Sequence, residues 1–551
     1  MQRLYKNNYM ENIMFNFIHQ CSNKHLSAIK PAGHFIIIIF LIGFCGVFSS
    51  CASKTAPEKP NIILILTDDQ GWTDTSVPMM KGREDSKSDF YQTPNLDRLA
   101  KAGMVFSNAY APAPVCSPTR YSILYGKTPA RLHHATLNKN AATPEKELSL
   151  PKMIKAADPS YITAHFGKWH QPTSSPEDAG YDESTGPTGN GEGDWISPGV
   201  PNPPDDPKRT FSLSRKACEF MSNQVKADRP FFMQVSYYAV HVQNYALEKT
   251  KEKYRNMKPG KKSNPRDFEL PPPPLNQGMV AYAAMVEDLD TGFGMILDKL
   301  DELGITDNTY VIFTSDNGGG FRGNEPLQRG KADLWEGGLR VPTVVRGPKV
   351  SADTYCDVPI AGWDFFPTIG EIIGNTNPLP ENLDGGSLLE VFEKGNEGSV
   401  KRGEEALVFH FPWFNGEPES AIRLGDYKLI KNLDSRELWL FNLAEDIEEK
   451  NNLAEAMPEK TNALHNRLTS YLENVNAEHV MDLRKWRRKQ MVEQNIPEQE
   501  KKRKELLAKL KAATGTEKEE LTAQLKETER YLNWLKGEVV FTDERSKLHE
   551  N

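Results

Sequence analysis

Two continuous apolar runs and one long amphipathic segment set the pattern of the first part of the chain. Asn61–Thr67 (NIILILT) and Tyr310–Ser315 (YVIFTS) show no polar alternation, which is typical of strands buried on both faces of a parallel sheet. Between them, residues 279–303 carry apolar side chains at helical spacing and are followed by Gly304. A helix followed by a strand predicts an α/β fold, with a mostly parallel central sheet flanked by helices.

Acidic residues follow both apolar runs at once. Asp68 and Asp69 come directly after the first run, and Asp316 and Asn317 come directly after the second. Ligands gather at the carboxyl ends of strands in open α/β sheets, so we expect the two clusters to meet in space. One Asp pair alone would favour a helix cap or a solvated loop. Two clusters of oxygen ligands instead predict a site for one Ca²⁺ ion, with Mg²⁺ as the alternative.

The pattern of predicted secondary structure changes near residue 400. Segments 419–430 and 437–442 are strand-like and 464–472 is helical, which predicts a small antiparallel sheet with one helix. The whole pattern divides the chain into a signal peptide (1–50), a tether (51–60), a large domain (61–398), a smaller C-terminal subdomain (399–480) and a charged helical extension (481–551).

The C-terminal extension has the pattern of a helical hairpin. Thr516 and Glu519 form a capping box, and leucines follow on one face of the helix that it begins. Ala513–Gly515 would turn this helix back on residues 498–512. The hairpin is either a solvated pair of helices packed on the body, or a dimer contact or wall of a substrate cleft.

The N-terminal residues have the layout of an export signal. Lys24 and Lys30 precede the apolar run Phe35–Phe48, which is short for a membrane span. The run ends in Phe-Ser-Ser-Cys, which resembles a bacterial lipobox, so we predict lipidation at Cys51; plain secretion and a signal anchor are the alternatives. The lipid would be the only membrane contact. The residues before Met14 are atypical of a leader, which makes Met14 an alternative start.

Composition narrows the function without naming it. The chain has 551 residues and a formal net charge of -8, which argues against a general nucleic-acid binder but leaves an anionic substrate open. Its six cysteines include no CxxC pair, so a zinc ribbon or a disulfide scaffold is not expected. Three of them, Cys116, Cys218 and Cys356, lie beyond the leader and cannot all pair with one another.

One set of short motifs carries the functional prediction. In chain order its members are Asp68-Asp69-Gln70-Gly71-Trp72, Thr93-Pro94-Asn95-Leu96-Asp97-Arg98-Leu99-Ala100, Cys116-Ser117-Pro118-Thr119-Arg120, Gly167-Lys168-Trp169-His170, Tyr238-Ala239-Val240-His241, Ser315-Asp316-Asn317-Gly318-Gly319, Lys331, and Glu336-Gly337-Gly338-Leu339-Arg340-Val341-Pro342. Together and in this order they resemble the type I sulfatase family of the alkaline-phosphatase superfamily. The resemblance covers roughly residues 60 to 460.

The resemblance implies that the nucleophile is a post-translationally modified residue. In sulfatases with this motif, a separate formylglycine-generating enzyme oxidises the cysteine, here Cys116, to formylglycine (3-oxoalanine). The hydrated aldehyde then attacks sulfur. Cys116 would also lie at the metal, together with the ligands Asp68, Asp69, Asp316 and Asn317. A sulfate ester is itself an anion, so the site has to neutralise charge before a nucleophile approaches.

The resemblance also implies roles for the basic side chains. Arg120 would hold the aldehyde hydrate, which suits a guanidinium that stays charged. Lys168 and Lys331 would grip the sulfate oxygens. His241, with Lys331, would protonate the leaving alcohol as general acid, and His170 would assist loss of sulfate from the covalent intermediate.

The expected substrate is a sulfated polysaccharide or oligosaccharide, and the expected location is the periplasm or cell envelope. The substrate class follows from analogy with the family, whereas the location follows from the lipoprotein-like leader. Aromatic and imidazole side chains that could contact sugar, or simply pack, are His133, His134, Trp195, His410 and Trp413. Two other functions stay open: a phosphomonoester or phosphonate hydrolase of the same superfamily, and a non-catalytic surface lipoprotein that binds glycans.

Overall fold

The computed structural model describes residues 59–135, 146–193, 203–257, 277–320, 324–412 and 417–536. The chain divides into two units, Met1–Glu58 and Lys59–Asn551, and every described residue belongs to the second. The predicted export signal with Cys51, and also Trp195 and Trp413, lie outside the described residues. None of the helices in the described ranges combines the length and the apolar character that crossing a membrane requires.

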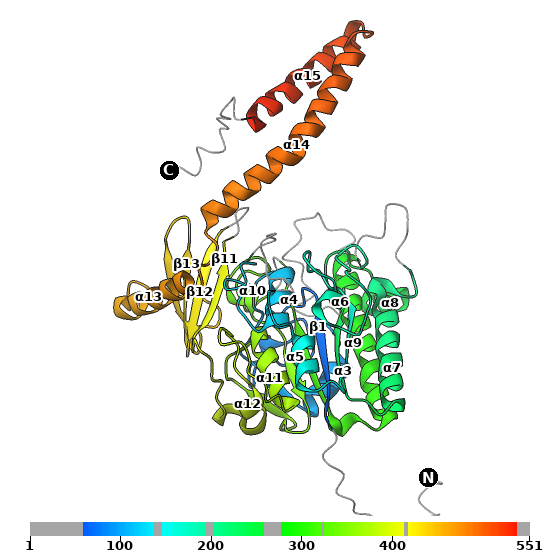
Figure 1. Cartoon of the computed structure of the whole chain (residues 1–551), viewed down its shortest axis with the longest axis vertical. Coiled ribbons are helices and arrows are strands. Elements are labelled where there is room, and N and C mark those ends of the chain that lie inside the picture. Colours follow the sequence, from blue (N-terminus) through cyan, green and yellow to red (C-terminus); the bar gives the residue numbers. More distant parts are fainter. Residues whose placement is uncertain are drawn as a thin grey trace, which may run out of the picture. The chain divides into compact units, whose positions relative to one another are not determined.

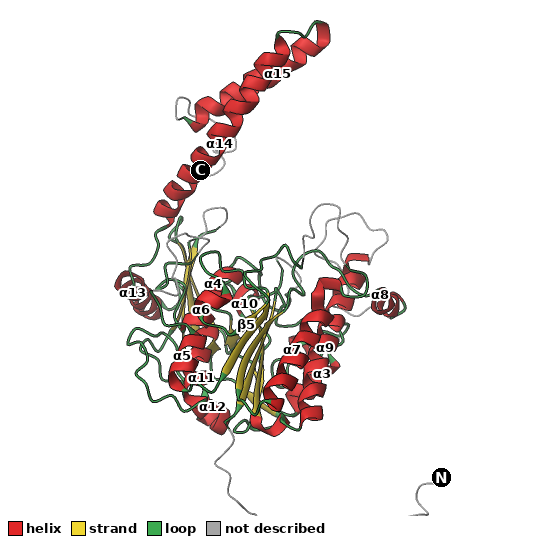
Figure 2. Ribbon diagram, turned by 45° about the vertical axis from the view of Figure 1, so that its right-hand side comes forward, coloured by secondary structure: helices red, strands yellow, loops and turns green. Residues whose placement is uncertain are grey.

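An eight-stranded sheet forms the centre of the large domain (Figures 1 and 2). β8 pairs antiparallel with its two neighbours, and the other pairings are parallel. The predicted mostly parallel sheet is therefore confirmed. Across the sheet the strands are β5 (Glu183–Ser184), β4 (Ile162–Gly167), β6 (Phe231–Ser236), β1 (Asn61–Thr67), β7 (Thr309–Ser315), β8 (Val344–Arg346), β2 (Met104–Phe106) and β9 (Thr354–Cys356).

β1 explains why the sheet lies inside the molecule. Its alternate side chains point to opposite faces, as in any strand. Ile63 and Ile65 enter one hydrophobic cluster, whereas Ile62, Leu64 and Leu66 enter another. Both faces are apolar, so both have to be covered by helices.

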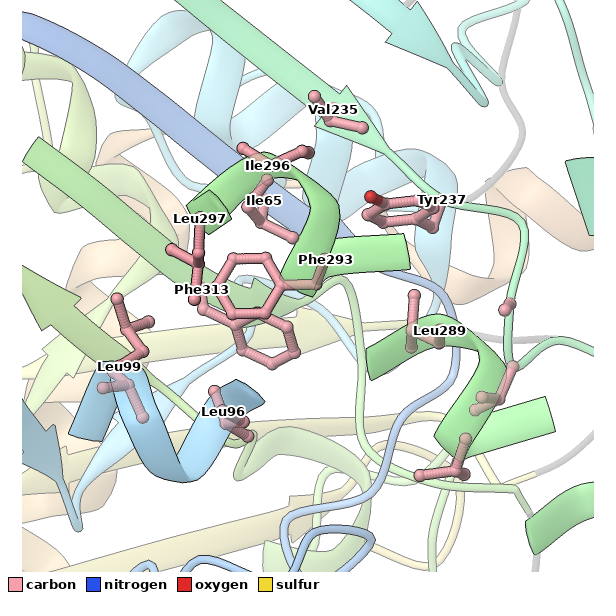
Figure 3. Close-up of a cluster of buried hydrophobic side chains, with 14 of the residues drawn as sticks. Ile65, Leu96, Leu99, Val235, Tyr237, Leu289, Phe293, Ile296, Leu297 and Phe313 are labelled. Atoms are coloured by element: carbon pink, nitrogen blue, oxygen red, sulfur yellow. The ribbon is translucent and has the colours of Figure 1, made fainter. Parts of the chain in front are cut away.

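Two layers of helices cover the two faces, and Figure 2 shows the sheet between them. The cluster that contains Ile65 is drawn in Figure 3, where Phe293 of one helix lies beside Phe313 of β7. The helices of this layer are α3 (Pro94–Lys101), α7 (Thr210–Lys226), α8 (Glu248–Arg255) and α9 (Gln277–Leu303). The opposite layer contains α4 (Cys116–Tyr125), α5 (Leu150–Ala157), α11 (Phe365–Ile372) and α12 (Leu389–Lys394).

Short elements connect these layers. They are α6 (Pro176–Ala179), α10 (Glu336–Leu339), the strand pair β3 (Ala109–Tyr110) and β10 (Ile360–Ala361), and the 3₁₀ turns Glu84–Ser86, Pro207–Arg209, Thr306–Asn308, Gly362–Asp364 and Gly395–Glu397.

The smaller part of the chain is an antiparallel sheet with one helix, as predicted. Its strands, in order, are β11 (Leu407–Phe411), β12 (Glu419–Leu424), β13 (Tyr427–Asn432) and β14 (Leu438–Asn442), and the helix is α13 (Pro458–Asn474). The segment 419–430 is two strands rather than one, and β11 was not predicted. The domain boundaries at 398 and 480 stay predictions.

Two long helices, α14 (Val480–Leu510) and α15 (Gly515–Leu535), follow the antiparallel sheet. They pack against each other, with an ion pair between Arg503 and Glu529 at 2.8 Å. α14 begins at Val480, well before the predicted residue 498, and continues through Pro497. The capping box at Thr516 is wrong, because α15 begins at Gly515 and its N-cap residue is Thr514.

Buried charges join the antiparallel sheet to the large domain. The Lys428 ammonium on β13 lies 2.8 Å from a carboxylate oxygen of Glu336 and 2.8 Å from one of Glu449. The backbone N–H of Glu336 donates to the second oxygen of Glu449 at 2.7 Å, and Arg340 pairs with Glu336 at 2.6 Å. All four side chains are almost completely buried.

Replacing Lys428 by Met should destabilise the protein by about 3–5 kcal/mol, because it leaves two buried carboxylates without their shared cation. The measurement is the free energy of unfolding in urea. Lys431→Met on the same strand is the matched control, since the Lys431 side chain is only partly buried. Equal losses in the two variants would contradict the expected strength of the buried cluster.

Candidate active site

Four neighbouring parallel strands deliver polar side chains to one edge of the central sheet. β4, β6, β1 and β7 are adjacent in that order, and Thr67 pairs with Ser315 at the ends of β1 and β7. The two acidic clusters that follow these strands therefore meet, and the Asp69 backbone N–H donates to an oxygen of Asp316 at 3.2 Å. Lys168 directly follows β4, and His241 lies in the loop after β6.

The first turn of α4 carries the predicted nucleophile. Cys116 is the first residue of the helix, and Arg120 lies one turn later on the same side. Two guanidinium nitrogens of Arg120 donate to one oxygen of Asp316 at 3.0 and 2.6 Å, and a third donates to the Lys168 carbonyl. Arg120 thus fixes α4 against the ends of β7 and β4.

Glycines allow the loop that carries Lys331 to approach the end of β7. The Gly318 backbone N–H donates to the carbonyl oxygen of Gly338 at 2.9 Å. A Cβ atom on Gly318 would lie 2.0 Å from the carbonyl oxygen of Gly337, so no larger residue fits there without moving backbone. The glycines that follow Asn317 and Glu336 in the sequence are explained by this close approach.

The oxygen-rich cluster fits a hard divalent cation. Asp68, Cys116 and Asp316 each offer a ligand atom within 4.8 Å of the others, and so do Asp68, Asp69 and His241. One oxygen of Asp68 and the side-chain oxygen of Asn317 are buried and accept no hydrogen bond within the described residues. Buried polar atoms without a partner are costly, and a bound cation would satisfy both.

Electrostatics also favours a cation at this place. Burial would raise the pKa of Asp68, but the positive charges of Lys168 and its neighbours outweigh burial and hold that pKa well below its usual range. Burial and repulsion from Asp68 raise the pKa of Asp316 to about 6, against the opposing effect of Arg120. Carboxylates crowded in this way gain from any bound positive charge.

Two lysines face the acidic cluster. The Lys168 ammonium lies 2.6 Å from Asp68, and the Lys331 ammonium lies 2.7 and 2.8 Å from the two oxygens of Asp69. Burial would lower the pKa of both lysines, but the carboxylates outweigh burial and raise it. Both side chains therefore stay positively charged and can attract an anionic group to this site.

Two histidines lie on either side of the cluster. His170 Nδ1 is 3.2 Å from the Cys116 sulfur, and His241 Nε2 is 3.7 Å from an oxygen of Asp69. Burial and the nearby charges of Lys168 and Arg120 lower the pKa of His170 to about 3, so its imidazole is neutral. Burial raises the pKa of the Cys116 thiol.

Every residue predicted to be catalytic or to bind the metal lies in this one cluster. Asn317 completes it, because its amide donates to Asp69 at 2.9 Å. The structure brings together side chains from positions 68 to 331, and their individual chemical roles stay predictions.

Comparison with known proteins identifies the family to which the chain belongs. The family model described as Sulfatase matches residues 60–375, which is more than half of the sequence. The chain belongs to the sulfatase family. It is therefore a sulfuric ester hydrolase, and its large central sheet and small antiparallel sheet match the alkaline-phosphatase-like fold of this family.

Individual sulfatases resemble the chain over most of its length. A protein of Formosa agariphila named sulfatase is 30% identical over 533 residues, covering 78% of this chain and 91% of that protein. The human N-acetylgalactosamine-6-sulfatase is 30% identical over 416 residues, covering 68% of this chain and 72% of the human protein. The solved structure of Ps i-CgsB in complex with k-i-k-neocarrahexaose has a TM-score of 0.62 and 26% identity, covering 75% and 93% of the two chains.

Two of the sugar contacts considered from the sequence are packing residues instead. His134 is completely buried and lies 3.0 Å from the Ser117 hydroxyl, beside the ring of Tyr121. His410 on β11 is also buried, and its ring nitrogens contact the Ser420 hydroxyl and the Glu478 carbonyl, each at 2.8 Å. Neither imidazole is free to contact sugar, whereas His133 is partly exposed.

Sequence reasoning missed a side chain that holds the His241 loop. The Lys208 ammonium donates to the carbonyl oxygens of His241 and Val242. Lys208 lies in an irregular stretch with no helical or strand periodicity, so no pattern in the sequence singled it out.

The buried His410 should make the stability of this sulfatase depend on pH. Burial lowers its pKa to about 4, below the ordinary value of about 6.5. The neutral imidazole thus contributes stability that is complete above pH ~6.5 and is lost as pH falls toward ~4. Between pH ~6.5 and ~5 the loss is about 2 kcal/mol, at ~1.4 kcal/mol per pH unit. Urea unfolding at pH 7 and pH 5 measures it.

His410→Gln should reduce the difference in unfolding free energy between the two pH values by that amount. His133→Gln is the matched control and should keep the wild-type difference. A His410→Gln protein that loses as much stability as wild type on acidification would contradict the assignment.

Proposed function

We propose that this sulfatase hydrolyses sulfate esters on a sulfated polysaccharide or oligosaccharide, using a formylglycine made from Cys116 and one bound Ca²⁺ ion. The observation that carries the proposal is the convergence of Lys168, Lys331 and Arg120 with an oxygen-rich cluster around the Cys116 side chain. Relatives named for sugar sulfates, and a similar structure bound to a carrahexaose, support the carbohydrate substrate.

The residues present fit both groups that the family uses. Asp68, Asp69, Asp316 and Asn317 would hold the cation, with residue 116 beside them. When bound, the cation supplies charge neutralisation and the aldehyde hydrate at residue 116 supplies the attacking hydroxyl. A formylglycine-generating enzyme is therefore a necessary partner during maturation.

The chain's own side chains would perform the remaining steps. Lys168 and Lys331 bind the sulfate oxygens, because their ammonium groups stay charged in a buried site. Arg120 keeps residue 116 oriented toward the acidic cluster through its bonds to Asp316. His241, with Lys331, protonates the departing sugar oxygen, which leaves as a hydroxyl group, and His170 accepts a proton from residue 116 at its Nδ1 atom.

We also propose that the enzyme is exported to the periplasm or cell envelope and anchored there by a lipid on Cys51. The short apolar run before Phe-Ser-Ser-Cys supports this location. Membrane fractionation of the full chain in a bacterial host tests it: Cys51→Ala should move the protein from the membrane fraction to the soluble fraction or leave its leader uncleaved. A Cys51→Ala protein that behaves as wild type would overturn the lipid anchor.

Cys116→Ala should lower turnover by several orders of magnitude, because alanine cannot be converted to the aldehyde. The assay is release of inorganic sulfate after co-expression with a formylglycine-generating enzyme, from N-acetylgalactosamine 6-sulfate, carrageenan oligosaccharides and 4-nitrophenyl sulfate. Cys218→Ala is the matched control and should keep wild-type turnover, since Cys218 is a half-buried thiol on α7 outside the cluster.

Mass spectrometry of the peptide that contains residue 116 shows whether the wild-type cysteine has been converted to the aldehyde, so the turnover results can be interpreted. Unchanged turnover in Cys116→Ala would sink the formylglycine proposal. A converted wild-type protein that binds sulfated glycans but releases no sulfate would instead favour the glycan-binding alternative.

Removing the cation should lower both turnover and thermal stability. Ca²⁺ binds only the folded site, so at one hundred times its Kd it should add about 2.7 kcal/mol of stability. After chelation, the shift in Tm on adding Ca²⁺ or Mg²⁺ is measured by calorimetry. Asp316→Asn should abolish the shift, whereas Asp353→Asn, an exposed carboxylate, should keep it. A wild-type Tm that ignores both ions would contradict the metal site.

A further inference from the structure

The segment that carries His241 is held to β1 on its N-terminal side by backbone hydrogen bonds. The Tyr237 N–H donates to the Leu66 carbonyl at 2.9 Å, and the Asp68 N–H donates to the Ala239 carbonyl at 3.0 Å. The Val240 N–H returns a bond to the Asp68 carbonyl at 2.6 Å. This side of His241 is thus fixed to the acidic cluster by the sheet itself.

On the C-terminal side of His241, the chain is held by the side chain of Lys208. Its ammonium donates to the carbonyl oxygens of His241 and Val242, each at 2.8 Å, and lies 5.9 Å from the centre of the Tyr245 ring. The Lys208 side chain is 1% exposed, whereas Val242 is 57% exposed. One buried cation therefore holds a segment whose next side chain reaches solvent.

The backbone around Lys208 is shaped to direct this side chain inward. Lys208 and Arg209 both have left-handed φ values, 58° and 53°, which are unfavourable for residues with a side chain. The Asp206 carboxylate caps the following helix by accepting from the N–H groups of Phe211 and Ser212 at 2.8 and 3.1 Å. The strained turn is thus anchored by α7 and delivers the ammonium to the His241 carbonyl.

We propose that Lys208 is a positioning residue for the general acid His241, and that it acts through the two carbonyl groups of His241 and Val242. The inference rests on the proposed function. A misplacement of about 1 Å can cost about a hundredfold in rate. Loss of the ammonium would leave the buried His241 carbonyl and the partly buried Val242 carbonyl without this donor, so the His241 backbone would shift and the imidazole would no longer meet the leaving oxygen.

A double-mutant cycle tests the route through His241. Lys208→Met should lower kcat/KM by about 100-fold, on whichever of N-acetylgalactosamine 6-sulfate, a carrageenan oligosaccharide or 4-nitrophenyl sulfate the wild type hydrolyses. In a His241→Gln background the same substitution should cost almost nothing further, because its effect passes through the missing imidazole. Lys208→Arg, which keeps the charge and the donors, should recover part of the activity.

Lys127→Met is the matched control. Lys127 is also a buried lysine, paired with Glu147, but it contacts none of the site residues in the described structure. Its effect should be the same in the wild-type and His241→Gln backgrounds. Additive losses for Lys208→Met would overturn the proposal.

Hydrogen exchange gives a readout that does not need turnover. Amides of residues 240–246 should exchange faster in Lys208→Met than in wild type and Lys127→Met, while those of β6 should not change. Unchanged exchange in 240–246 would overturn the positioning role. A wild-type protein that releases no sulfate, together with faster exchange in Lys208→Met, would instead sink the proposed function and leave the structural link standing.

Discussion

The register between β1 and β7 decides where every charged group of the site can lie. Thr67 and Ser315 are paired at the ends of these strands, so the residues that follow them must share one small volume. The two carboxylates after one strand and the carboxylate after the other repel one another unless positive charge is brought in. Lys168, Arg120 and Lys331 supply that charge from three other segments. The parallel sheet thus brings negative charges together, and basic side chains from neighbouring segments neutralise them.

This arrangement explains why basic side chains can be buried here. A buried ammonium or guanidinium is tolerated when it is paired and hydrogen-bonded. Arg120 satisfies this by bonding Asp316 and a backbone carbonyl, and Lys168 satisfies it through Asp68. An anionic substrate entering the site would exchange some of these partners for its own oxygens. The site is therefore organised around charge before any substrate arrives.

The central sheet and the acidic edge could be predicted from the sequence because their signals are local. A run such as NIILILT indicates a strand that is buried on both faces, and the end of that strand fixes the position of the residues that follow it. β11 could not be predicted, because LVFHF is short and its polar residue, His410, is satisfied only by contacts distant in sequence. A helix that continues through Pro497 could not be expected from the sequence, because proline inside a helix removes a backbone hydrogen bond. Lys208 was missed because it contacts backbone carbonyl groups of His241 and Val242, and such contacts leave no periodic pattern in the sequence.

The buried cluster of Lys428, Glu336 and Glu449 has a consequence for how sulfatases of this kind can be recombined. Glu336 begins α10 only five positions after Lys331, and both its backbone N–H and its carboxylate are held by residues of the antiparallel sheet region. The antiparallel sheet region is therefore part of the scaffold for the loop that carries Lys331. A chimera that exchanges everything after residue 398 with another family member would have to import a compatible lysine and glutamate, or the loop would lose its support. In this chain, exchange of the antiparallel sheet region is constrained by that internal charge match.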